Sequence, residues 1–148
     1  RRRVHLHARR FAVPQGARGP RRTPRGQPQE QDAVEVLGVP VILVLGHDEC
    51  GAIRATIDST QGNLNSQGEF IHDLVERIRP TVEAANRAGK HEIDEITELH
   101  IQDTINEMLT RSALIADAVK AGKLAVVGAN YKLTLGEVHP IVTVGDIN

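Results

Sequence analysis

An apolar run from Val39 to Leu45 constrains the fold of this chain more than any other feature of the sequence. It reads Val-Pro-Val-Ile-Leu-Val-Leu, so β-branched and aliphatic side chains follow one another without a polar alternation. Such a run is typical of a strand buried on both faces, as in a parallel sheet, and Pro40 is tolerated at the entry of a strand. The segment from Gly46 to Gly51 then ends the run at the carboxyl end of the predicted strand.

Helical and strand patterns alternate along the rest of the chain. A short helix is expected to end at Gly38, and Ser66 and Glu69 have the spacing of a capping box before a helix in which Pro80 forces a kink or a restart. The predicted helices cover residues 52–58, 70–82, 93–109 and 113–121, and the predicted strands after them cover 124–129, 131–133 and 138–144, the last two flanking a hairpin turn. We therefore predict an α/β fold: a mostly parallel sheet flanked by helices, with an antiparallel edge strand.

Charge divides the chain into two unlike parts. Residues 1–25 hold nine arginines and no acidic residue, although the whole chain has 18 basic and 19 acidic residues. Residues 1–31 are also rich in Pro, Gly and Gln and poor in apolar side chains, so we expect this segment to be disordered and residues 32–148 to form one domain. A nucleic-acid or anion-binding tail, a transit peptide and an out-of-frame product of a GC-rich gene are the alternatives for residues 1–31.

Composition excludes several classes of protein. The single cysteine, Cys50, rules out an internal disulfide framework and a multi-cysteine zinc cluster within one chain. No apolar run approaches the roughly 18 residues of a membrane-spanning helix. Two Phe, one Tyr and no Trp supply no aromatic platform for single-stranded nucleic acid. We expect a cytoplasmic protein that has neither a membrane nor a nucleic acid as its partner.

The candidate site follows the most apolar strand directly. Ligand sites of open α/β sheets lie beyond the carboxyl ends of the strands, which is where His47 and Cys50 are expected. An imidazole and a thiolate are both good zinc ligands, and Gly46 and Gly51 allow the backbone to turn sharply beside them. Two other interpretations stay open from the spacing alone: Cys50 as a nucleophile activated by His47, and Cys50 as a small core residue.

The segment from Asp32 to Ile53, with Gly-His-Asp-Glu-Cys-Gly-Ala at residues 46–52, resembles the second metal-ligand motif of the β-class carbonic anhydrases. Residues 122–131 are similar to the last parallel strand of that family, and residues 135–138 to the turn and strand after it. The resemblance covers about residues 32 to 145. It implies a zinc enzyme that hydrates carbon dioxide reversibly to bicarbonate, with His47 and Cys50 as zinc ligands and Gly51 lining the substrate pocket.

The family's first motif, Cys-x-Asp-Ser-Arg, is absent from the sequence, and with it a second cysteine ligand and an aspartate–arginine pair. We therefore expect the metal site of this chain to be incomplete, and the chain as written to bind zinc weakly and to hydrate carbon dioxide poorly. His5 and His7 are remote candidates for a third ligand. His72, His91, His100 and His139 are interpreted as helix-surface or loop residues. The catalytic residues stay unassigned.

Two further expectations follow from the resemblance. The family assembles through its sheet, so a homodimer or a larger homo-oligomer is implied, and without its preceding strands the run from Val39 to Leu45 becomes an exposed apolar edge. A non-catalytic domain that binds a partner or an anion is the alternative function. The upstream DNA offers a direct check, because an out-of-frame origin of residues 1–31 predicts a Cys-x-Asp-Ser-Arg motif in another reading frame.

Overall fold

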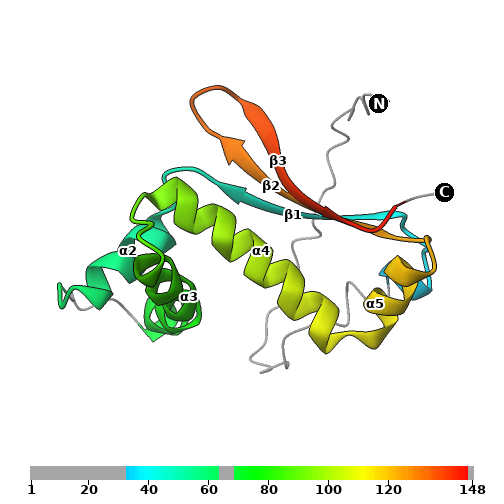
Figure 1. Cartoon of the computed structure of the whole chain (residues 1–148), viewed down its shortest axis with the longest axis horizontal. Helices are drawn as coiled ribbons and strands as arrows, with labels where there is room; N and C mark the ends of the chain where they lie inside the picture. Colours follow the sequence, from blue (N-terminus) through cyan, green and yellow to red (C-terminus); the bar gives the residue numbers. More distant parts are fainter. Residues whose placement is uncertain (1–32, 64–68, 147–148) are drawn as a thin grey trace.

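The structure is a computed structural model that describes residues 33–63 and 69–146. The predictions made for residues 1–31, for His5 and His7 and for Ser66 fall outside these residues. The described elements are, in chain order, β1 (Val41–His47), α2 (Gly51–Thr60), α3 (Glu69–Arg87), α4 (Ile93–Arg111), α5 (Ala113–Lys120), β2 (Ala125–Lys132) and β3 (Glu137–Val144). The order is one strand, four helices and two strands, and Figure 1 shows the helices together on one side of the sheet.

The described sheet has three strands in the order β1-β2-β3. β1 and β2 are parallel, with Val41 opposite Ala125 and His47 opposite Tyr131. β3 is antiparallel to β2, which confirms the predicted antiparallel edge strand. The segment predicted separately at residues 131–133 instead continues β2 to Lys132, because its backbone stays paired with β1 up to Tyr131 and with β3 up to Lys132. The hairpin turn that follows contains Gly136, where φ is +68°.

The helices lie close to their predicted positions, and a turn of helix at residues 33–35 precedes Gly38, where φ is +58°. Pro80 does not restart α3, which is continuous across it. Buried side chains on both sides of the proline, Ile78 and Val82, pack in the same cluster. The lost backbone hydrogen bond is therefore offset by packing.

Two apolar clusters form the core. The first joins α2, α3 and the start of α4, and the second joins α4 and α5 to the sheet. The absence of a side chain at Gly128 lets α4 approach the sheet, since a Cβ there would lie 2.7 Å from Ile101 Cγ2 and 2.9 Å from Ile105 Cδ1. Close packing on this side therefore depends on glycine in β2.

The two faces of β1 differ, which corrects the prediction of a strand buried on both. Ile42 and Val44 pack on the second cluster beneath α4. On the other side, which we call the open face, Val41, Leu43 and Leu45 keep 41%, 45% and 51% of their surface exposed. The reason is that the described helices cover one face of the sheet only. Within the described residues β1 pairs with β2 alone, as expected for an edge strand.

Among the described residues, no helix is both long and apolar enough to cross a bilayer.

Candidate metal-ligand site

The carboxyl end of β1 leads into a loop of three residues, 48–50, before α2 begins. His47 is the last residue of β1 and is exposed, Cys50 is the N-cap of α2 and is half-buried, and Gly51 is the first residue of that helix. The predicted site residues therefore lie together in one turn at the edge where parallel strands end.

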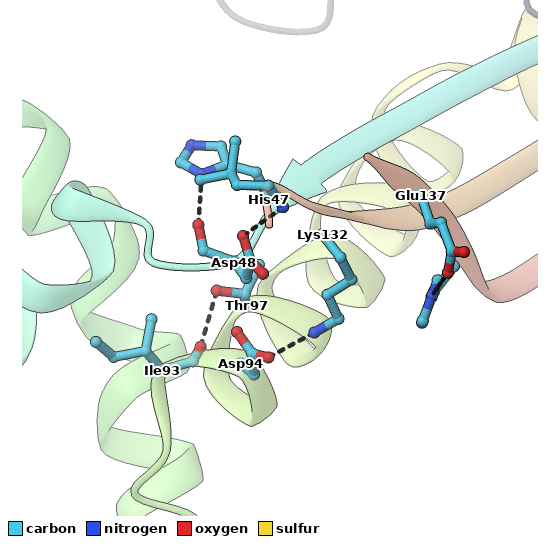
Figure 2. A network of polar contacts seen from close by, with 9 residues as sticks. His47, Asp48, Ile93, Asp94, Thr97, Lys132 and Glu137 are labelled. Atoms are coloured by element: carbon cyan, nitrogen blue, oxygen red, sulfur yellow. Dashed lines mark hydrogen bonds and ion pairs between the residues drawn. The ribbon is translucent and has the colours of Figure 1, made fainter. Parts of the chain in front are cut away.

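The ring of His47 is oriented by its own loop. Its Nδ1 lies 2.7 Å from the backbone carbonyl of Asp48, and Figure 2 shows this contact. A carbonyl oxygen only accepts hydrogen bonds, so Nδ1 is the donor of this contact, and in the neutral imidazole the lone pair then lies on Nε2. An imidazole held in this way is arranged as histidine ligands of metals usually are.

The surroundings of Cys50 are apolar, unlike the polar contact of His47. It is a free cysteine, and it packs against the apolar cluster that contains Ile53 and Ile96. No side-chain hydrogen bond caps α2 at this position. The packing leaves both interpretations of Cys50 open, as a ligand and as a small core residue.

Sequence reasoning missed two residues of the loop, Asp48 and Glu49. The Asp48 amide donates to the Tyr131 carbonyl at 3.0 Å, and its Oδ1 accepts a hydrogen bond from the Leu133 amide at 3.0 Å. Glu49 has a φ of +53°, in the left-handed region, and its carboxylate is 2.8 Å from Arg54. No spacing signal could have found the contacts of Asp48, because they join segments more than 80 residues apart in the sequence.

An ion pair links the end of β2 to the start of α4. Lys132, at the end of β2, donates to Asp94 in the first turn of α4, as Figure 2 shows. The hydrogen bond to Asp94 raises the pKa of Lys132. The lysine side chain is 18% exposed, so this contact is better shielded from solvent than the other ion pairs of the described residues. Nearby on the same strand, Asn130 is fully buried with both of its side-chain amide atoms unpartnered.

The remaining histidines are placed away from this loop. His72 is exposed on α3 and His91 lies in the turn before α4, as interpreted from the sequence. Two placements differ from that interpretation: His139 lies on β3, and His100 is half-buried where α3 and α4 meet, with its Nδ1 3.4 Å from Thr81 Oγ1. The apolar spacing of α4 did not reveal that this helix also contacts α3 through His100.

The donor set of the described residues is smaller than the set that zinc requires. Structural and catalytic zinc sites take three or four protein ligands. Residues 33–63 and 69–146 contain no cluster of three or more His, Cys, Asp or Glu side chains able to hold a metal ion. The described residues by themselves therefore do not complete a zinc site.

Comparison with known proteins identifies the family. A family model described as carbonic anhydrase matches residues 31–138. Over 115 residues the chain is 40% identical to a carbonic anhydrase of Mycolicibacterium smegmatis, covering 78% of this chain and 55% of that protein. It is also 40% identical over 105 residues to carbonic anhydrase 2 of Mycobacterium tuberculosis, covering 70% and 50%. The chain thus spans about half the length of these curated relatives.

Solved structures agree on the fold. A tetrameric β-carbonic anhydrase of Sordaria macrospora matches with a TM-score of 0.65 and 17% identity, over 78% of this chain and 59% of that one. The Coccomyxa β-carbonic anhydrase in complex with acetazolamide matches with a TM-score of 0.63 and 21% identity, over 78% and 53%.

Proposed function

The chain belongs to the β-class carbonic anhydrases, and from this premise we propose that His47 and Cys50 are two ligands of a zinc ion in a site that hydrates carbon dioxide reversibly to bicarbonate. Zinc-dependent hydration of carbon dioxide is the general reaction of the family. The observation that carries the proposal is the state of His47. Its Nδ1 hydrogen-bonds to the Asp48 carbonyl, so the neutral imidazole would present the lone pair of Nε2 at the carboxyl end of β1, three residues before Cys50.

Gly51 is proposed to line the substrate pocket. A Cβ built on this glycine would meet nothing within 4 Å, so the space beside the ligand loop is open at this point. A small apolar substrate requires such open space next to the reacting centre. The Cys50 backbone carbonyl is already engaged with the Arg54 amide at 3.0 Å, which holds the start of α2 and its glycine in place.

The site of this chain is proposed to be incomplete. The described residues supply two donors where zinc takes three or four. We expect the chain to hold zinc weakly and to turn over slowly. Residues 1–31 are proposed to be a segment distinct from the domain, and reading the three frames of the upstream DNA for Cys-x-Asp-Ser-Arg tests their origin.

The test combines metal analysis with stopped-flow hydration of carbon dioxide on the full chain. We expect less than one zinc per chain and slow turnover, with zinc affinity falling more than tenfold in His47→Ala and Cys50→Ser. His72→Ala, on the exposed face of α3, is the matched control. Stoichiometric zinc with rapid turnover would overturn the incomplete site, and unchanged zinc affinity in both ligand variants would overturn the ligand assignment.

A non-catalytic carbonic-anhydrase-like binding domain is the second candidate, and the two-donor set is the observation that favours it. A wild-type chain without zinc and without hydration activity would select this function. In either case we propose a homodimer or a larger homo-oligomer, supported by the uncovered apolar residues of the open face. A cytoplasmic location stays a prediction.

A further inference from the structure

The sheet of the described residues has two edges, the outer side of β1 and the outer side of β3. Charged residues, proline and an irregular register are devices by which an edge strand avoids pairing with another strand. β3 has all of them, since it carries Glu137, His139 and Pro140, and its register with β2 shifts between Gly128 and Ala129. The β3 edge is therefore protected.

β1 lacks these devices along its apolar part. Residues 41–45 contain no charged residue and no proline, and the register with β2 runs without a shift from Val41 to His47. Residues 1–31 hold four prolines and one apolar cluster, at residues 11–13, so their sequence is a poor source of a strand for this edge. We propose that the outer edge of β1 pairs antiparallel with the same edge of a second copy of this chain.

The backbone groups available at this edge follow from the pairing of β1 with β2. The carbonyl of Pro40 accepts from the Ala125 amide at 2.9 Å, and the amide of Asp48 donates to the Tyr131 carbonyl at 3.0 Å. Backbone groups point alternately to the two sides of a strand, so the even-numbered residues from 40 to 48 face β2. The amides and carbonyls that point to the outer edge belong to the odd-numbered residues Val41, Leu43 and Leu45.

An antiparallel pairing centred on Leu43 uses all of these outward groups. Leu43 of one copy lies opposite Leu43 of the other, and Val41 of each copy lies opposite Leu45. Each of these pairs exchanges two N–H···O bonds, because both of its residues direct their backbone groups at each other. A shift of the register by two residues would leave the outward groups of one of the three residues in each copy without a partner.

The same pairing brings apolar side chains together. Val41, Leu43 and Leu45 lie on the open face, where they keep 41%, 45% and 51% of their surface exposed. Aliphatic side chains in cross-strand pairs stabilise a sheet, so the backbone and the side chains favour the same arrangement. The inference rests on the homo-oligomer proposed above, for which it names the contact, and it does not depend on the proposed metal ligands.

The experiment measures self-association of the full chain by sedimentation velocity over a series of concentrations. Leu43→Lys places a charge at the centre of the edge, and Leu43→Pro removes the outward amide of the same residue without removing a bond to β2. Val138→Lys is the matched control, because Val138 is 49% exposed on the other edge strand and Leu43 is 45% exposed. Circular dichroism confirms that each variant is folded.

We expect the wild type to form dimers, and both Leu43 variants to raise the dissociation constant of the dimer at least about tenfold, through lost hydrogen bonds or a charge at the contact. Val138→Lys is expected to stay within about twofold of the wild type. Dimers of unchanged affinity in both Leu43 variants would overturn the edge contact and leave the proposed homo-oligomer standing. A monomeric wild type would overturn both.

Cysteine cross-linking tests the register without a disruptive variant. In a Cys50→Ser background, Leu43→Cys should form a disulfide-linked dimer under mild oxidation, because the two Cα atoms at position 43 lie about 5.5 Å apart in such a pair. Leu45→Cys should cross-link at least about tenfold more slowly, since it faces Val41. Equal cross-linking at the two positions would overturn the register. Slow exchange of the Leu43 amide in a monomeric wild type would assign the edge to another segment of the same chain and overturn the second copy.

Discussion

The two faces of β1 carry equally apolar side chains but have opposite surroundings. Ile42 and Val44 lie beneath α4 in the second cluster, whereas Leu43 and Leu45 are about half exposed on the open face. Side-chain type therefore does not decide which face is buried. The decisive difference lies in the partner, since the covered face meets Ile101 and the helix that carries it, and the open face meets no helix of the described residues.

The described residues specify how α4 packs on the covered face, but they do not specify what packs on the open face. Glycines in β1 and β2 admit the side chains of α4 so closely that a methyl group at Gly46 would lie 2.7 Å from Ile101 Cδ1. Such interlocking fixes the register of helix and sheet. On the open face no helix of the described residues interlocks with the strand in this way, so the described residues of one chain do not fix its partner there.

The largest expected effect comes from truncating the covered side. Ile105 is 1% exposed in the second cluster, so Ile105→Ala should lower the free energy of unfolding by about 3 kcal/mol through lost burial and a cavity. Leu43→Ala on the open face is the matched comparison, with an expected loss below about 1 kcal/mol. Urea unfolding followed by circular dichroism measures both. Equal losses at the two positions would show that the open face is covered in solution.

A methyl group added to the covered side should have the next largest effect. At Gly128 a Cβ would lie within 2.9 Å of side chains from both α4 and β3, so Gly128→Ala should cost about 2 kcal/mol. At Gly51 the same change meets open space and should shift stability by no more than about 0.5 kcal/mol. Thermal unfolding of the two variants tests the difference, and a stable Gly128→Ala protein would contradict the close approach of α4.

The smallest expected effect concerns pH. Burial lowers the pKa of His100, and the nearby carboxylates of Asp103 and Glu107 offset part of that shift. The unfolded chain therefore binds a proton more readily than the native one, and stability should fall as pH drops below about 6.5. His100→Gln should flatten this slope between pH 7.5 and pH 5.5, whereas His72→Gln should preserve it. Denaturant midpoints at the two pH values measure the slope, and an identical slope in His100→Gln would exclude this cause.

The sequence predicted the elements well because their signals are local. Gly122 ends a helix because glycine readily adopts positive φ, which depends on the residue itself. The spacing of Ile101 and Ile105 indicates a buried face of the helix without information on its partner. The open face was wrongly predicted as buried, since a continuous apolar run reports side-chain type and carries no information on which layer covers it. A restart was one of the two outcomes predicted at Pro80 and does not occur, because the packing that offsets the proline comes from other helices.

The residues of the candidate site also differ in whether a local signal or a long-range contact identifies them. His47, Cys50 and Gly51 were found because a short motif places them next to one another. Their contribution to a metal site stays a prediction. Asp48 could not be found, because its partners lie beyond four helices and are brought to it only by the pairing of β1 with β2.

The parallel pairing of β1 with β2 has a consequence for the order of folding. Helices α2 to α5 all lie between the two strands, so β1 can gain its neighbour only after the whole crossover has been synthesised and has folded back. Contacts of such high sequence separation form slowly, because the entropy of closing the intervening chain is lost before they stabilise the structure. During that interval the apolar strand β1 has no partner strand among the described residues. Folding yield should therefore depend on chain concentration, with chaperone assistance acting mainly on β1.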